Sequence, residues 1–151
     1  MTSTAQQALD RQYNTQQRKT VETISFNNRG LEGELDLSEY SQLKSLIFYD
    51  NKITKVNLTN NPKLTYLHLG NTQLSEIDLT NNSKLEHLIL QGTPTFKQDM
   101  STFKHLTQLK EIHVHGTKTY GSFRALTNLN QLTRINFINT NVDEDILQNA
   151  Y

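Results

Sequence analysis

Residues 58–78 read LTNNPKLTYLHLGNTQLSEID, and the chain repeats this pattern from residue 79 as LTNNSKLEHLILQGT. Leu58 aligns with Leu79 and Leu64 with Leu85, so the two copies are shifted by 21 residues. A repeat of this length is typical of a solenoid, because one unit cannot bury its own apolar edge and must share a core with its neighbours.

The repeated unit is built on a kernel of three apolar residues, the second three positions after the first and the third two positions later. Six kernels follow one another in the same frame: Val21-Ile24-Phe26, Leu43-Leu46-Phe48, Leu64-Leu67-Leu69, Leu85-Leu88-Leu90, Leu109-Ile112-Val114 and Leu132-Ile135-Phe137. Apolar and polar residues alternate within each kernel, which predicts a short strand with its apolar side chains in the core. Successive strands are expected to lie parallel, ~4.8 Å apart.

A polar residue lies three positions after each kernel, and an apolar residue usually returns two positions later. The polar residues are Arg29, Asn51, Thr72, Thr93, Thr117 and Thr140, and the apolar ones are Leu31, Ile53, Leu74 and Val142. From about residue 21 to residue 142, the chain therefore resembles the leucine-rich-repeat family, whose pattern is L-x-x-L-x-L-x-x-N-x-L. Departures are visible: only Asn51 keeps the asparagine of that pattern, and Thr95 replaces the apolar residue of the fourth repeat. The other polar residues must bond the turn backbone in another way.

The resemblance implies an α/β fold, a solenoid of six repeats of 21–24 residues with a parallel sheet on its concave face. The opposite, convex side is expected to change character along the chain. Alternating residues at 31–37, 53–58 and 74–79 predict extended returns, whereas apolar residues spaced by three around 103–109 and 123–132 predict 3₁₀ or helical turns. The longer segment 93–102 marks the change, and we interpret it as a connecting loop rather than as a contact for a partner.

Both ends of the solenoid need caps that shield the core from water. Residues 1–20 are expected to form a helical cap, because apolar residues recur there at helical spacing behind a Ser/Thr N-cap: Ala5, Ala8, Leu9 and Tyr13. Residues 143–151 begin with acids, as helix N-termini do, and predict a short C-terminal helical cap. Either this short helix suffices or the natural chain continues past Tyr151.

The 151 residues are 34% apolar, carry equal numbers of acids and bases, and include no cysteine. A formal net charge of +0 gives no general attraction to nucleic acid or anionic lipid, and no stretch is apolar enough to span a membrane. The first residues lack the basic and apolar regions of a signal peptide, and a chain without disulfides suits a reducing compartment. We therefore expect a cytoplasmic protein without nucleic-acid or membrane partners.

The strand register predicts which side chains point out of the sheet on the concave face. They include tyrosines, isoleucines and four of the five histidines but no lysine, and such a composition is typical of interface cores. The resemblance implies that this face binds a protein or peptide. The partner-binding residues that we predict are Ile47, Tyr49, Tyr66, His68, His87, Ile89, Gln91, Glu111, His113, His115, Arg134 and Asn136. The alternative is that exposed strand positions simply favour β-branched and aromatic residues.

The segment EIHVHG at 111–116 suggests a different function, because Glu111, His113 and His115 share one face of the predicted strand. A catalytic zinc needs three protein ligands and an open position. The residues expected beside the two histidines are not zinc ligands, and Glu111 is expected to pair with Arg134 on the next strand. We therefore favour a non-enzymatic recognition module, with no catalytic residue, metal or cofactor, over a metal-dependent enzyme.

Two further alternatives remain. The chain could be a scaffold or dimerisation segment of a larger protein, although we expect it to be a monomer. The histidines of the concave face could also make binding depend on pH, because imidazole changes charge between about pH 5 and 8. The simpler interpretation, which we favour at this point, is that they are contact residues.

Overall fold

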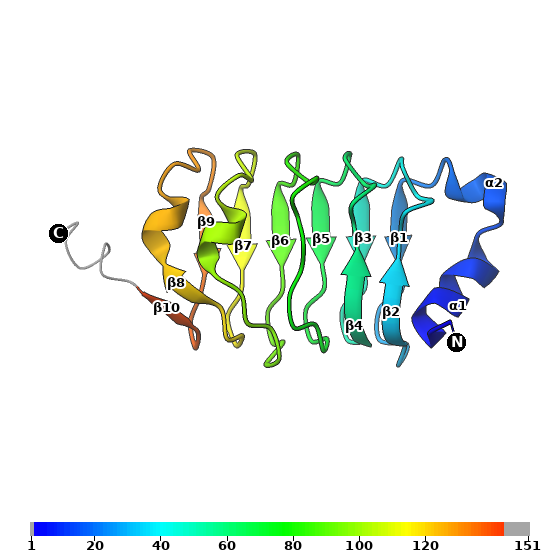
Figure 1. The fold of residues 1–151 in the computed structure, drawn as a ribbon, viewed down its shortest axis with the longest axis horizontal. Coiled ribbons are helices and arrows are strands. Elements are labelled where there is room, and N and C mark those ends of the chain that lie inside the picture. The colour runs from blue at the N-terminus through cyan, green and yellow to red at the C-terminus, as the bar shows by residue number, and fades with distance from the viewer. Residues whose placement is uncertain (1, 144–151) are drawn as a thin grey trace.

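The computed structural model describes residues 2–143, which form a solenoid of six turns with one short strand per turn (Figure 1). These strands make a single parallel sheet in the order β1-β3-β5-β6-β7-β9. Their bounds are Thr23–Ser25 (β1), Ser45–Ile47 (β3), Tyr66–His68 (β5), His87–Ile89 (β6), Glu111–His113 (β7) and Arg134–Asn136 (β9). The register pairs the middle kernel residue of each repeat with that of the next, so the sequence period sets the stacking.

The kernels fill one continuous hydrophobic core. The middle kernel residues of the first five repeats are fully buried: Ile24, Leu46, Leu67, Leu88 and Ile112. In the sixth repeat, Ile135 is 36% exposed, and its kernel partners Leu132 and Phe137 are half-buried. The core is therefore closed along five repeats and thins at the sixth.

Each strand is followed by a corner where the backbone enters the left-handed region. The corner residue comes two positions after the kernel, with φ between 53° and 69°: Asn28, Asp50, Asn71, Gly92, Gly116 and Asn139. Asparagine, aspartate and glycine are the residues that tolerate this conformation best. The corner N–H of the first five repeats donates to a carbonyl of the next repeat, so the corners form a second periodic row beside the sheet.

The polar residue one position after the corner bonds backbone groups as expected in five of the six repeats, whereas the Arg29 guanidinium of the first repeat lies over the Phe26 ring. Asn51 is buried, its amide donates to the carbonyls of Phe26 and Phe48, and its Oδ1 accepts from two backbone N–H groups. In Thr72, Thr117 and Thr140 the hydroxyl instead donates to the carbonyl three residues earlier. Each of these threonines thus makes the bond to the carbonyl of its own strand end but not the bond that the Asn51 amide makes to the carbonyl of the preceding repeat.

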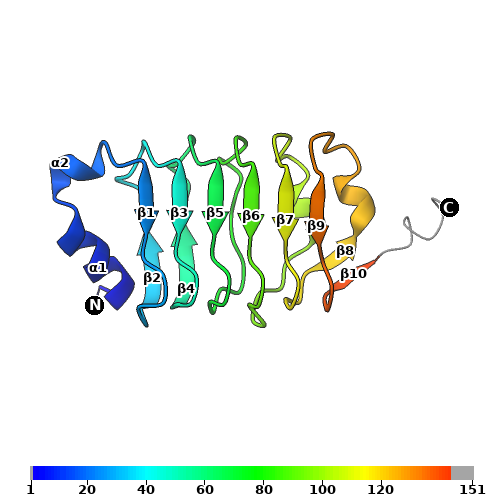
Figure 2. The same cartoon turned by 180° about the vertical axis from the view of Figure 1, so that it is seen from behind.

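The return side of the solenoid is built from short, separate pieces. Two strands, Glu32–Asp36 (β2) and Lys52–Asn57 (β4), pair in parallel, as do Tyr120–Ser122 (β8) and Asn141–Asp143 (β10). Two 3₁₀ turns, Met100–Phe103 (η1) and Phe123–Leu126 (η2), lie in the later repeats. Figure 2 shows β2 and β4 behind the six-stranded sheet. The expected 3₁₀ turns are therefore present in the later repeats, but short extended returns occur there as well as in the first two repeats.

No paired strand forms in the predicted extended return at 74–79. The side-chain amide of Gln98 bonds both backbone groups of Ile77, accepting from its N–H at 2.8 Å and donating to its C=O at 3.0 Å. A side chain thus occupies the position where a neighbouring strand would pair. Gln98 belongs to the fourth repeat, in which Thr95 takes the position of the usual apolar residue. The Thr95 hydroxyl donates to the carbonyl of Leu74, and the adjacent Phe96 is the residue buried in the core.

Two helices, Thr4–Gln12 (α1) and Thr15–Arg18 (α2), stand at the N-terminal end of the row of strands (Figure 1). Ala5 and Leu9 are fully buried against the first repeat. Side chains of Ser3, Thr4 and Gln6 bond the free backbone edge of β2. The start of the chain therefore covers both the core and a strand edge.

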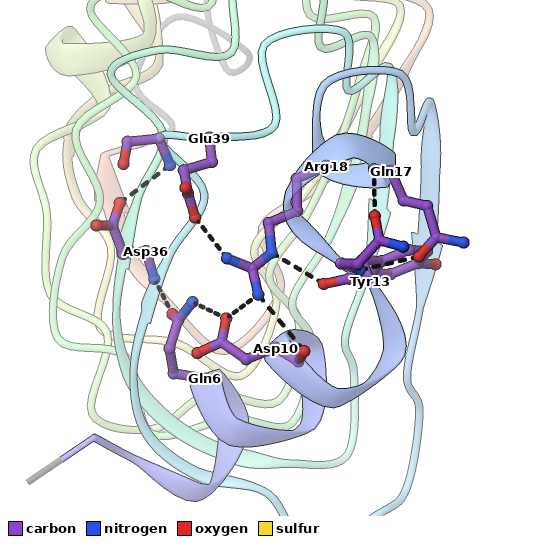
Figure 3. A network of polar contacts seen from close by, with 9 residues as sticks. Gln6, Asp10, Tyr13, Gln17, Arg18, Asp36 and Glu39 are labelled. Carbon is purple, nitrogen blue, oxygen red and sulfur yellow. Dashed lines mark hydrogen bonds and ion pairs between the residues drawn. The ribbon is translucent and has the colours of Figure 1, made fainter.

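A polar network fastens this cap (Figure 3). The guanidinium of Arg18 donates to Glu39 Oε2 at 2.9 Å and to the carbonyl of Tyr13 at 2.9 Å, and it lies 3.4 Å from Asp10 Oδ1. Gln6 joins Asp10 to the backbone of Asp36. The predicted C-terminal cap at 143–151 lies outside the described residues, apart from Asp143 at the end of β10.

Candidate functional site: the face of the six-stranded sheet

In Figure 2 the six strands lie in front of β2 and β4. We call the outer surface of these strands the sheet face: it consists of their outward-facing side chains together with the residue two positions after each strand. The register aligns Tyr66, His87, Glu111 and Arg134 in one row. It aligns Ile47, His68, Ile89, His113 and Asn136 in the adjacent row. Residues from five turns of the chain therefore share one continuous surface.

The side chains of the N-terminal half of this face pack on one another. The rings of Tyr49 and His68 have centroids 4.6 Å apart, and those of Tyr66 and His87 are 5.4 Å apart. Ile89 points outward yet is only 9% exposed. Burial raises the pKa of Tyr66, consistent with a phenol held against its neighbours. The side chains of this half of the face thus already contact one another in the absence of a partner.

Gly70 lies on this face and lets the His68 ring come close to the backbone. Its N–H donates to His68 Nδ1 at 3.2 Å, and a Cβ at this position would meet His68 Cε1 at 3.0 Å and the Gln91 carbonyl at 3.1 Å. Burial is the main cause that lowers the pKa of His68. The neutral ring accepts at Nδ1, so its proton sits on Nε2. Sequence reasoning did not single out Gly70, although a glycine beside a strand often marks such a close approach.

Glu111 is the centre of the C-terminal half of the face. One carboxylate oxygen lies 2.8 Å from His87 Nδ1, and the other lies 3.3 Å from His113 Nε2 and 3.8 Å from Arg134 Nη1. Burial opposes ionisation of Glu111, but the hydrogen bonds from the two imidazoles outweigh it, and the pKa is lowered. The expected contact with Arg134 is present, but it is the longest of the three, and the imidazoles are the closer partners.

The last residues of the face are more open. The His113 and His115 rings meet edge to face at 6.2 Å. The Arg134 side chain is 79% exposed, and Ile138 is 66% exposed. The side-chain oxygen of Asn136 accepts a hydrogen bond from the backbone N–H of Ile138. This end of the face therefore presents an exposed guanidinium and an exposed apolar side chain beside the two imidazoles.

The structure brings most of the predicted binding residues into two contact groups. Tyr49 and His68 form one, and the row from Tyr66 to Arg134, joined by His113, forms the other. Ile47 and Gln91 lie half-buried on the same surface. Within residues 2–143, no three His, Cys, Asp or Glu side chains are arranged to hold a metal ion. The same part of the chain contains no helix long and apolar enough to cross a membrane.

Comparison with known proteins adds the fold family. No protein-family model and no curated protein matches the sequence. Among solved structures, the leucine-rich-repeat ectodomain of the receptor kinase SOBIR1 from Arabidopsis thaliana superposes with a TM-score of 0.70 at 19% identity, over 79% of this chain and 70% of that one. The functional domain of InlJ from Listeria monocytogenes gives 0.66 at 28% identity, over 72% of this chain and 23% of that one.

A third similar structure is the plant peptide hormone receptor RGFR1 in complex with RGF2, with a TM-score of 0.69 at 18% identity, over 86% of this chain and 23% of that one. This chain thus spans less than a quarter of the InlJ and RGFR1 chains. Parallel strands stacked one per repeat make the chain a β-solenoid. Its fold is that of the leucine-rich-repeat proteins, as the spacing of the kernels predicted.

Proposed function

We propose that this chain is a non-enzymatic recognition module that binds a protein or an extended peptide through the sheet face, the predicted concave face. One observation carries the proposal: tyrosine, histidine and isoleucine side chains from successive repeats pack into one preformed surface. A surface whose rotamers are already fixed loses little entropy when a partner binds. Aromatic residues placed in this way supply large contact areas.

The similar structures support a recognition role. One of them, the plant receptor RGFR1, was solved in complex with RGF2. No constellation of nucleophile, base and orienting group is apparent on the sheet face, where Glu111 is instead engaged by its three neighbours. We further propose a cytoplasmic location, on the grounds given by the cysteine-free sequence.

The test is affinity capture with the wild-type chain and with a variant that carries Tyr49→Ala, Tyr66→Ala and His87→Ser. The matched control replaces exposed residues of the return side, Lys97→Ala and Thr102→Ala. Mass spectrometry should find a partner retained by the wild type and by the control and lost from the sheet-face variant. A partner captured equally by all three would contradict recognition through this face.

A second candidate function is assembly through the C-terminal end of the solenoid. The observation in its favour is that the sixth kernel is partly open, with Ile135 at 36% exposure and Phe137 half-buried beside Phe123. Solenoid ends need a cover, and we propose that a second copy of the chain supplies it. Sedimentation equilibrium separates the possibilities, because assembly predicts a dimer that Ile135→Asp dissociates, whereas a monomer at all concentrations would exclude self-association.

A further inference from the structure

The sheet face is unbalanced in hydrogen-bonding character. Glu111 is the one carboxylate among its described residues, and it is 12% exposed and already engaged. The neighbouring acids are also engaged: Glu86 pairs with Lys110, and Asp50 accepts from Asn71 at 2.8 Å. An incoming carboxylate would therefore meet donors without a free competing acid, and an incoming ammonium group would find no free carboxylate.

The hydrogen bonds to Glu111 fix which ring nitrogens carry protons. The ionised carboxylate only accepts, so His87 donates through Nδ1 and His113 donates through Nε2. The opposite nitrogens, His87 Nε2 and His113 Nδ1, remain for other partners. Protonation of either ring keeps its bond to Glu111 and adds one N–H donor and one positive charge. Acidification thus changes the chemistry of the face while the rings keep their anchor.

The groups packed around these two rings do not cancel the added charge. His87 lies against the phenol of Tyr66 and next to Glu86, which Lys110 engages. His113 faces Glu111 and Arg134 and meets His115 edge to face. His68, on β5, is the remaining titratable neighbour of His113, and His113 is one of the causes that lower its pKa. With both rings protonated, one carboxylate stands against two imidazolium groups and a guanidinium.

We propose that His87, Glu111, His113 and Arg134 form a carboxylate-binding subsite for an extended acidic peptide, and that binding tightens as the pH falls from about 7.5 to 5.5. The proposal rests on the proposed recognition function and adds the chemistry of the partner. An Asp or Glu side chain of the peptide lies over Arg134 and the protonated rings. Its apolar residues reach the Tyr49 and Tyr66 side of the same face.

The test begins with a random decapeptide library, displayed on mRNA and selected against the folded chain at pH 5.5 and at pH 7.5. Asp and Glu are expected to be enriched at pH 5.5 beside apolar residues. The best peptide and its Asp→Asn or Glu→Gln twin are then synthesised and measured by fluorescence polarisation. We expect the acidic peptide to bind about tenfold more tightly at pH 5.5 than at pH 7.5, and the twin to change less than about twofold.

Variants of the chain locate the effect. Arg134→Gln should weaken binding of the acidic peptide about tenfold and leave the twin unchanged, and His113→Gln should reduce the ratio between the two pH values. Arg124→Gln on η2 removes the same charge from the return side and should change nothing. Circular dichroism at both pH values checks that each variant is folded.

The outcomes separate the two proposals. Peptides that lose affinity in the Tyr49/Tyr66/His87 variant but show no carboxylate preference, or that are enriched in Lys and Arg, overturn the subsite and leave the recognition function standing. Peptides that keep their affinity in that variant refute peptide recognition through the sheet face and the subsite with it. A selection that returns no binder overturns the subsite alone, and the affinity capture described above then decides whether the face recognises a folded protein.

Discussion

Replacing Asn51 by alanine should test how much one buried side chain holds two repeats together. The side chain is 3% exposed and bonds the carbonyls of Phe26 and Phe48 at 2.6 and 3.0 Å. Its Oδ1 accepts from the N–H groups of Arg29 and Leu31, each at 3.1 Å. At ~1 kcal/mol of net stability per bond, and with water reaching part of the Arg29 turn, Asn51→Ala should lower the free energy of unfolding by about 3 kcal/mol.

The chain supplies its own intermediate variant. In the third repeat the Thr72 hydroxyl donates to the Leu69 carbonyl at 2.9 Å, so Asn51→Thr should keep the corresponding bond to the Phe48 carbonyl and lose the bonds to the first repeat. Its loss should be about 2 kcal/mol, ~1 kcal/mol less than that of the alanine variant. Urea unfolding followed by far-UV circular dichroism measures both, and Tm should fall by about 6–12 °C for alanine. An alanine variant within 0.5 kcal/mol of the wild type, or a threonine variant no more stable than alanine, would refute the reasoning.

Three further predictions concern stability, each measured by urea unfolding. Leu9→Ala leaves a cavity at a fully buried position of α1 and should lower the free energy of unfolding by about 2–4 kcal/mol. Arg11→Ala, at an exposed position of the same helix, should lower it by less than about 0.5 kcal/mol. Equal losses would show that the packing of α1 does not stabilise the fold. Gly92→Ala places a Cβ 2.0 Å from Asn71 Oδ1 at a residue with φ +68°. Gly116 has a similar positive φ, but a Cβ there meets no atom closer than 3.5 Å. Gly92→Ala should therefore lower the free energy of unfolding by about 1 kcal/mol more than Gly116→Ala does. Because the pKa of His68 is lowered in the fold, the folded chain binds a proton at this ring less readily than the unfolded chain does. The folded state therefore has its full stability above the ordinary histidine pKa and loses part of it as the pH falls. Between pH 7.5 and 5.5 the wild type should therefore lose more stability than His68→Gln, and parallel losses would contradict this.

The kernels made the sheet predictable, because a side chain must face the core at fixed intervals if the repeats are to stack. The corners could also be predicted from the sequence, since only Asn, Asp and Gly stand two positions after the six kernels. The lack of a paired strand at 74–79 was not predictable from the alternation of that segment, because backbone groups of Ile77 are bonded by Gln98 from the following repeat. The alternation of apolar and polar residues within 74–79 gives no information about a bond from a side chain 21 residues later in the chain.

On the sheet face, too, some features could be predicted from the sequence and others could not. The columns of side chains follow from the register, and the pairing of Glu111 with Arg134 could be expected from neighbouring strands. The closer bonds of Glu111 to His87 and His113 depend on rotamers and burial. The contact between His68 and Gly70 depends on the absence of a side chain. These features are set by packing in three dimensions, which spacing along the chain does not determine.

The Gln98 amide that bonds Ile77 has a consequence for how such molecules can vary. The fourth repeat is three residues longer than its predecessor, yet the pairing of β6 with β7 is unbroken, with Leu88 opposite Ile112. The extra length is absorbed entirely on the return side, where one side chain closes the gap. Loops could therefore be lengthened or grafted at 93–102 without moving the sheet face, which makes this segment a natural place for evolution or engineering to add a second contact while preserving the first.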